Sequence, residues 1–144
     1  MNYLKLFIIF ICISMYACSG NYEQRYENFS DFSKENLRNK GWFPNIVFSG
    51  AYELKNNSYL DPLCAFGEFS YSKSDFYDSI FTNPNRQISI SLFEEKAREH
   101  KKRRPNWFLN LDNMSKSQFE TIKMERFYIV RQKDEKKIYF VLSN

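Results

Sequence analysis

The segment that most constrains the fold is the C-terminal one, where two apolar-rich runs flank a short charged stretch. They are, in order, MERFYIVRQ, the charged KDEK and KIYFVLS, which together span residues 124–143. Because side chains alternate between the two faces of a strand, one face is expected to hold Ile138, Phe140 and Leu142, with Phe127 and Ile129 as partners. The positions between them are also largely apolar: Tyr128, Val130, Tyr139 and Val141. The pattern predicts a β-hairpin in a sheet that is covered on both faces.

Short helices are expected to cover this sheet. They are predicted at residues 30–41, 49–53 (a single turn), 72–81 and 92–104. The first has Ser30 or Ser33 as its N-cap and Gly41 at its end. Ser91 and Glu94 have the spacing of a capping box, which opens the last helix. The sequence thus predicts short helical segments between extended ones.

One further strand is indicated by the composition of CAFGEFSY, residues 64–71. Gly67 lies in its interior, which suggests a bulge or a close approach of the backbone. Together with the hairpin and the helices, this strand predicts an α+β domain. We expect short helices on a mostly antiparallel sheet of three to five strands.

The N-terminal 17 residues have the pattern of a secretory signal. Lys5 precedes an unbroken apolar run at residues 6–13, which is far shorter than the ~20 residues that cross a bilayer. MYACSG then resembles the lipobox of bacterial lipoproteins, in which the Cys, here Cys18, receives palmitate and other acyl chains after cleavage behind Ala17. Ordinary signal cleavage after Ala17, without a lipid, is the other interpretation.

These features predict three segments. Residues 1–17 are the signal peptide, residues 18–28 a lipidated Cys with a polar tether, and residues 29–144 a globular domain. In a lipoprotein of a Gram-negative bacterium, Ser19 after the Cys favours the outer membrane over the inner one. The predicted localisation is therefore the cell envelope.

Composition excludes some classes of function. Loss of residues 1–17 removes Lys5, one of 21 basic residues against 17 acidic ones, and leaves a net charge of +3. That charge is too small to indicate nucleic-acid binding. No motif for a cofactor or a metal is present, and we predict neither. Cys64 would be the one free thiol of the mature chain, and a lone Cys is typical of a buried apolar position.

The strongest concentration of charge is a basic cluster made of Lys101, Lys102, Arg103 and Arg104. A solvated helix end explains it simply, because cations are stabilised at a helix C-terminus. The alternatives are contact with anionic lipid or with an acidic protein of the envelope. Asp75 and Asp78 lie one turn apart on a predicted helix, and a solvated surface explains them.

The stretch GWFPNIVFSGAYEL, residues 41–54, combines turn residues with an apolar run. With FGEFSY and the later RPNWF, it resembles small bacterial lipoproteins of unknown function that carry a YbbD-type head domain. The resemblance covers residues 29–110 and rests on these positions: Gly41, Trp42, Pro44, Ser49, Ala51, Asp61, Phe66, Phe69 and Trp107. The resemblance implies a lipoprotein with a single domain, and it implies no enzymatic activity because none is known for the family.

We therefore expect a membrane-anchored envelope lipoprotein that acts by binding and not by catalysis. Trp42, Trp107 and the basic cluster are the candidate binding residues, and membrane lipid at Cys18 is the expected partner. Two other classes stay open. One is a hydrolase that uses Cys64 and His100 with a carboxylate such as Asp61; the other is a lipoprotein that neutralises a toxin, as immunity proteins do.

Overall fold

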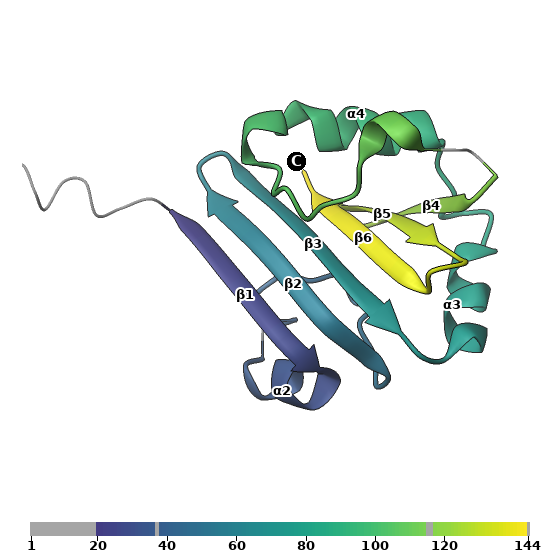
Figure 1. Ribbon diagram of the computed structural model, residues 1–144, viewed down its shortest axis with the longest axis horizontal. Coiled ribbons are helices and arrows are strands. Elements are labelled where there is room, and N and C mark those ends of the chain that lie inside the picture. The colour runs from purple at the N-terminus through teal and green to yellow at the C-terminus, as the bar shows by residue number, and fades with distance from the viewer. Residues whose placement is uncertain (1–19, 37, 115–116, 144) are drawn as a thin grey trace, which may run out of the picture.

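The computed structural model describes residues 20–36, 38–114 and 117–143, which form one antiparallel sheet with short helices packed on it (Figure 1). In spatial order the sheet reads β1-β2-β3-β6-β5-β4. Its strands are β1 (Asn21–Asn28), β2 (Ala51–Leu60), β3 (Leu63–Tyr71), β4 (Phe119–Met124), β5 (Phe127–Gln132) and β6 (Lys137–Leu142). The expected α+β class is confirmed, with six strands in place of the three to five predicted.

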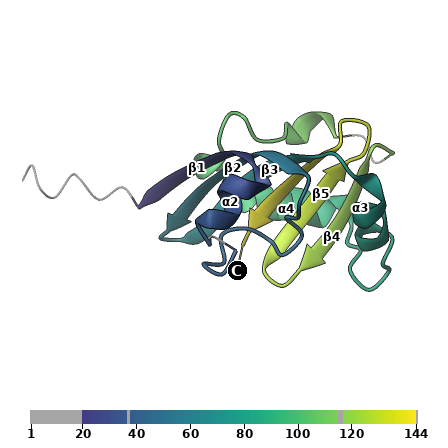
Figure 2. The same ribbon diagram turned by 90° about the horizontal axis from the view of Figure 1, so that it is seen from below.

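The helices are short and lie at different parts of the sheet. They are α2 (Phe29–Lys34), α3 (Ser74–Phe81), α4 (Ile90–Glu99) and the 3-10 helices η1 (Lys101–Arg103) and η2 (Leu111–Asn113). Figure 2 shows α2 beside β1 and α3 beside β4, near the two edges of the sheet. The outer edge of β4 also receives the chain before α4, where the Ile88 N–H donates to the Thr121 carbonyl over 3.1 Å.

Both faces of the sheet carry a hydrophobic cluster, as the C-terminal hairpin predicted. On one face Phe127, Ile129 and Phe140 join side chains from α2 and α3, which we call the first cluster. On the other face Val130 and Val141 pack with Phe93 of α4, in the second cluster. The hairpin itself is confirmed, since β5 pairs with β6 across a turn at residues 133–136.

The N-terminal half of the sheet corrects two predictions. Residues 21–28, expected as a tether, form the edge strand β1, and residues 49–53, expected as a helical turn, lead into β2. Neither strand has an apolar alternation, because β1 has no buried residue and β2 buries Asn56, Asn57 and Ser58 beside its apolar Ala51 and Leu54. Asn56 of β2 is fully buried, and its side-chain amide donates to Gln24 of β1 over 3.0 Å. Backbone pairing and polar contacts thus hold this edge.

The helix boundaries also differ from those expected. The first helix stops at Lys34, and its cap is Asn28, which accepts from the N–H of Asp31 over 3.0 Å. Gly41 instead occupies a turn with a φ of 75°, which glycine adopts without strain. The last helix begins at Ile90, two residues earlier than predicted, with Ser89 in place of Ser91 as its cap, and ends at Glu99.

We predict that Ser89→Ala lowers the free energy of unfolding by about 1 kcal/mol, the usual loss of an N-cap. The Ser89 side chain accepts a hydrogen bond from the Leu92 N–H over 3.2 Å, and alanine removes this acceptor while the Ser89 carbonyl, at 3.1 Å from the same N–H, remains. Urea unfolding followed by circular dichroism measures the change. Ser91→Ala, inside the helix, is the matched control and should alter stability by less than about 0.5 kcal/mol; a larger loss at Ser91 than at Ser89 would contradict the assignment.

Candidate functional site

The basic cluster Lys101, Lys102, Arg103 and Arg104, which we call the basic turn, directly follows helix α4. Phe93 and Ala97, both fully buried, fix this helix to the sheet. The α-helix ends at Glu99, because His100 leaves the helical conformation with a φ of −111° and a ψ of 32°. Four cations therefore gather at the C-terminal end of α4, where the negative end of the helix dipole stabilises them.

Arg103 joins the basic turn to the turn between β2 and β3. Its Nη1 donates to the carbonyl of Pro62 over 3.2 Å, and its guanidinium lies 5.0 Å from the ring centroid of Tyr59. The Tyr59 hydroxyl in turn donates to the Arg103 carbonyl over 3.1 Å. A cation over an aromatic face and two hydrogen bonds fix the position of this arginine, so it serves mainly to hold the two turns together.

Lys101 and Lys102, by contrast, are exposed. Among the residues that the structure describes, no ion pair includes either of them. Two hollows of about 380 Å³ each flank Lys101, one beside Pro62 and the other beside Arg104 and Asn110. The basic turn thus presents two exposed cations that form no ion pair with the described residues.

Cys64 and His100, the candidate nucleophile and base, have separate surroundings. Cys64 is fully buried, and burial raises the pKa of its thiol, although Arg103 beside it opposes the shift. His100 has its Nε2 at 3.4 Å from the Ser143 hydroxyl, which donates to Glu99 over 3.0 Å. Burial lowers the pKa of His100, against the attraction of Glu99. No hydrogen bond between described residues joins Cys64 to His100.

The two tryptophans lie on opposite faces of the sheet. Trp42 is half-buried against the first cluster and Trp107 is half-buried against the second. Trp107 follows the basic turn in the chain, and the Nζ of Lys55 lies 5.9 Å from its ring centroid. The candidate binding residues therefore do not form one surface, since Trp42 is apart from the others.

A charged group that the sequence did not reveal lies on strands β2, β3 and β6. Glu68 is only 3% exposed, and its Oε1 lies 2.9 Å from the Nζ of Lys55 and 4.0 Å from the Nζ of Lys137. Both lysines border a groove of about 760 Å³ that runs beside Arg25. The one carboxylate offsets one of the two lysine charges, and the strand register creates the closer pair, because Lys55 lies opposite Glu68 across β2 and β3.

Residues 20–36, 38–114 and 117–143 contain neither a cluster of metal ligands nor a membrane-spanning helix. In these ranges no three His, Cys, Asp or Glu side chains gather as metal ligands would. No helix there is both long enough and apolar enough to cross a bilayer. Cys18 and Ala17, the predicted acylation and cleavage positions, lie outside the described residues.

The fold defines a small, single-domain α+β protein with a six-stranded antiparallel sheet. The family model of the YbbD head domain matches residues 20–70, from β1 to all but the last residue of β3. This confirms the resemblance over a segment that includes Gly41, Trp42 and Pro44, while Trp107 lies beyond the match. No curated protein and no solved structure matches the chain.

Proposed function

We propose that the protein is an envelope lipoprotein, held at a membrane by acyl chains on Cys18, whose domain acts by binding. The observation that carries this proposal is the order of features along the chain. A basic residue, an apolar run and the lipobox-like MYAC directly precede the first strand. Every strand and helix that the structure describes begins at Asn21 or later, so cleavage after Ala17 would leave each of them intact.

The surroundings of the candidate nucleophile support binding over catalysis. A thiol attacks as the thiolate, which requires a lowered pKa and access to solvent. Cys64 has no exposed surface, and burial raises the pKa of its thiol. Arg103 opposes this shift only in part, and its guanidinium also donates to the Pro62 carbonyl in the β2–β3 turn. The surroundings of Cys64 therefore do not support the hydrolase alternative.

Acylation at Cys18 predicts a specific labelling result. Cells that produce the full chain and are fed a palmitate analogue should incorporate the label into this protein, and Cys18→Ala should abolish it, because the thiol is the acceptor. Gel fluorescence after immunoprecipitation measures the label, and Cys64→Ala is the matched control that should retain it. Labelling that persists in Cys18→Ala would overturn the proposal, as would a wild-type protein without label.

The location at the outer membrane is part of the same proposal. Ser19, the residue after the acylated Cys, supports sorting to the outer membrane, and the envelope is where a partner of this domain would be found. Fractionation of the membranes of the labelled cells on a sucrose gradient would assign the layer in the same experiment.

A further inference from the structure

We propose that the end of the domain nearest to its N-terminus docks on an anionic bilayer. This anchor end consists of Gly20 and the start of β1, the β2–β3 turn (residues 60–63) and the basic turn. The inference rests on the proposed acylation of Cys18 and adds to it a defined membrane-facing surface.

Chain geometry brings the anchor end to the membrane. Asn21 pairs with Tyr59 in the register of β1 and β2, and a Cβ placed on Gly20 would lie 3.9 Å from the Cβ of Leu60. Cys18 is two residues before Gly20, and two extended residues span at most about 7 Å. In Figure 1 the start of β1, the β2–β3 turn and the segment after α4 lie at the same end of the sheet. Acyl chains on Cys18 thus hold this end close to the lipid.

The anchor end also exposes side chains that partition into a bilayer interface. Tyr22 and Leu60 are each 56% exposed, the largest values among the large hydrophobic side chains described. An amphipathic aromatic ring is favoured at the level of the headgroups, and burial of apolar surface there adds to binding. Tyr52 and Phe76, which are also exposed, lie at the opposite end of the sheet.

The charges of the anchor end favour an anionic surface. Lys101 and Lys102 are exposed, while Arg103 connects the basic turn to the β2–β3 turn. Asp61, exposed in the β2–β3 turn, and Asp112, which interacts electrostatically with Lys101, offset part of the positive charge. Lysines within a Debye length of an anionic leaflet are attracted to it. A lipid anchor, exposed apolar side chains and cations thus coincide at one end, which is the combination that stable membrane docking requires.

The test uses the full, acylated protein in vesicles with a lipid-borne fluorescence quencher. A fluorophore is attached at Leu60→Cys in one sample and at Phe76→Cys, at the opposite end, in the matched control. In vesicles with anionic lipid we expect strong quenching of the label at position 60 and little quenching at position 76. Equal quenching at the two positions would overturn the docking surface.

A charge variant separates docking from anchoring. Lys101→Gln with Lys102→Gln is expected to lower the ratio of docked to undocked protein by about 30-fold, as two lysines near an anionic surface predict. Lys133→Gln with Lys136→Gln, the same change of charge in the β5–β6 turn, should leave the ratio unchanged. Equal effects of the two pairs would overturn the docking surface, and intact palmitate labelling would then leave the lipoprotein proposal standing. Loss of labelling in the wild type would overturn both.

Discussion

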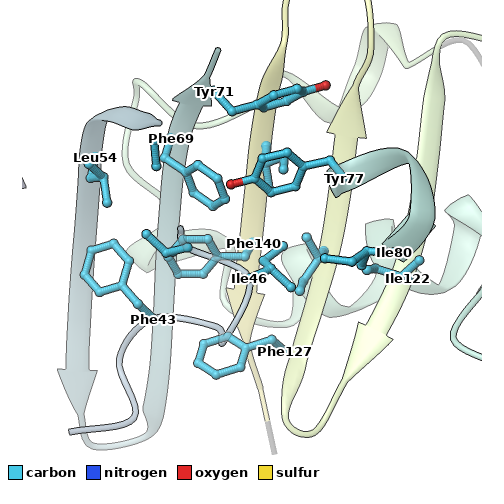
Figure 3. Packing of buried hydrophobic residues seen from close by; sticks show 14 of the residues in the cluster. Phe43, Ile46, Leu54, Phe69, Tyr71, Tyr77, Ile80, Ile122, Phe127 and Phe140 are labelled. Carbon is cyan, nitrogen blue, oxygen red and sulfur yellow. The ribbon is translucent and has the colours of Figure 1, made fainter. Parts of the chain in front are cut away.

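Replacing Gly67 by alanine is expected to lower the free energy of unfolding by about 3 kcal/mol. A Cβ at this position would lie 2.0 Å from the Cζ of Phe140, far inside van der Waals contact. Phe140 lies opposite Gly67 across β3 and β6 and is fully buried. The rings of Phe43 and Phe127 flank it, with centroids 5.4 and 5.8 Å away (Figure 3). Because this ring has no room to withdraw, the strands themselves would have to separate.

Urea unfolding measures the effect, and a double mutant shows its cause. Phe140→Leu removes ring atoms next to Gly67, so Gly67→Ala should cost at least about 1 kcal/mol less in that background than in the wild type. Additive effects of the two substitutions would show that the ring is not the obstacle. A loss below about 0.5 kcal/mol for Gly67→Ala alone, the level of a surface change, would contradict the close approach.

The second large effect is expected at the buried cation Arg131. Neutralising its two partners, with Asp78→Asn and Glu120→Gln, should lower the free energy of unfolding by about 3 kcal/mol, because a buried charge loses its compensation. Arg131 has no exposed surface. Its Nη1 lies 2.6 Å from Asp78 and its Nε 2.6 Å from Glu120. We expect the lower end of the usual range, since Asp78 is 47% and Glu120 32% exposed at the side chain.

A third substitution distinguishes loss of compensation from loss of contacts. Arg131→Met removes the buried charge and keeps an extended apolar side chain against Phe81, whose ring centroid lies 4.7 Å from the guanidinium. Replacing a buried charge by an apolar side chain of similar size is often neutral, so this variant should lie within about 1 kcal/mol of the wild type. If Arg131→Met proves the more destabilising change, the ion cluster stabilises the fold by itself and the stated reason is wrong.

The ion cluster around Arg131 shows what neighbouring residues in the chain can predict and what they cannot. Asp78 was predicted on a short helix, which α3 confirms, but a solvated surface was the expected role of its carboxylate. The structure instead pairs it with Arg131, 53 positions along the chain. The residues next to Asp78 in the sequence do not indicate that Arg131 is its partner. Helix periodicity depends on neighbours three and four positions away, whereas ion pairing across the fold depends on packing of α3 on the sheet.

The candidate site also has features that the sequence predicts and features that only the structure shows. The basic turn could be predicted, because its four cations are consecutive and close a helix. Its attachment to the β2–β3 turn could not, since Arg103 and Pro62 meet over 41 positions of sequence. The Glu68 cluster was equally hidden: a carboxylate in a strand indicates a buried partner only when the register is known.

By itself the sequence determined the α+β class, the C-terminal hairpin with its two apolar faces, strand β3 with a bulge or a close approach at Gly67 as alternatives, and the signal-like N-terminus. These follow from alternation, capping and composition, which act between near neighbours in the chain. Only the tertiary structure decided that residues 21–28 and 51–60 are strands, and that Gly20, Leu60 and the basic turn share one end. The physical reason is that strands such as β1 and β2 are held by backbone hydrogen bonds to distant segments, and those bonds require no apolar side chains to form.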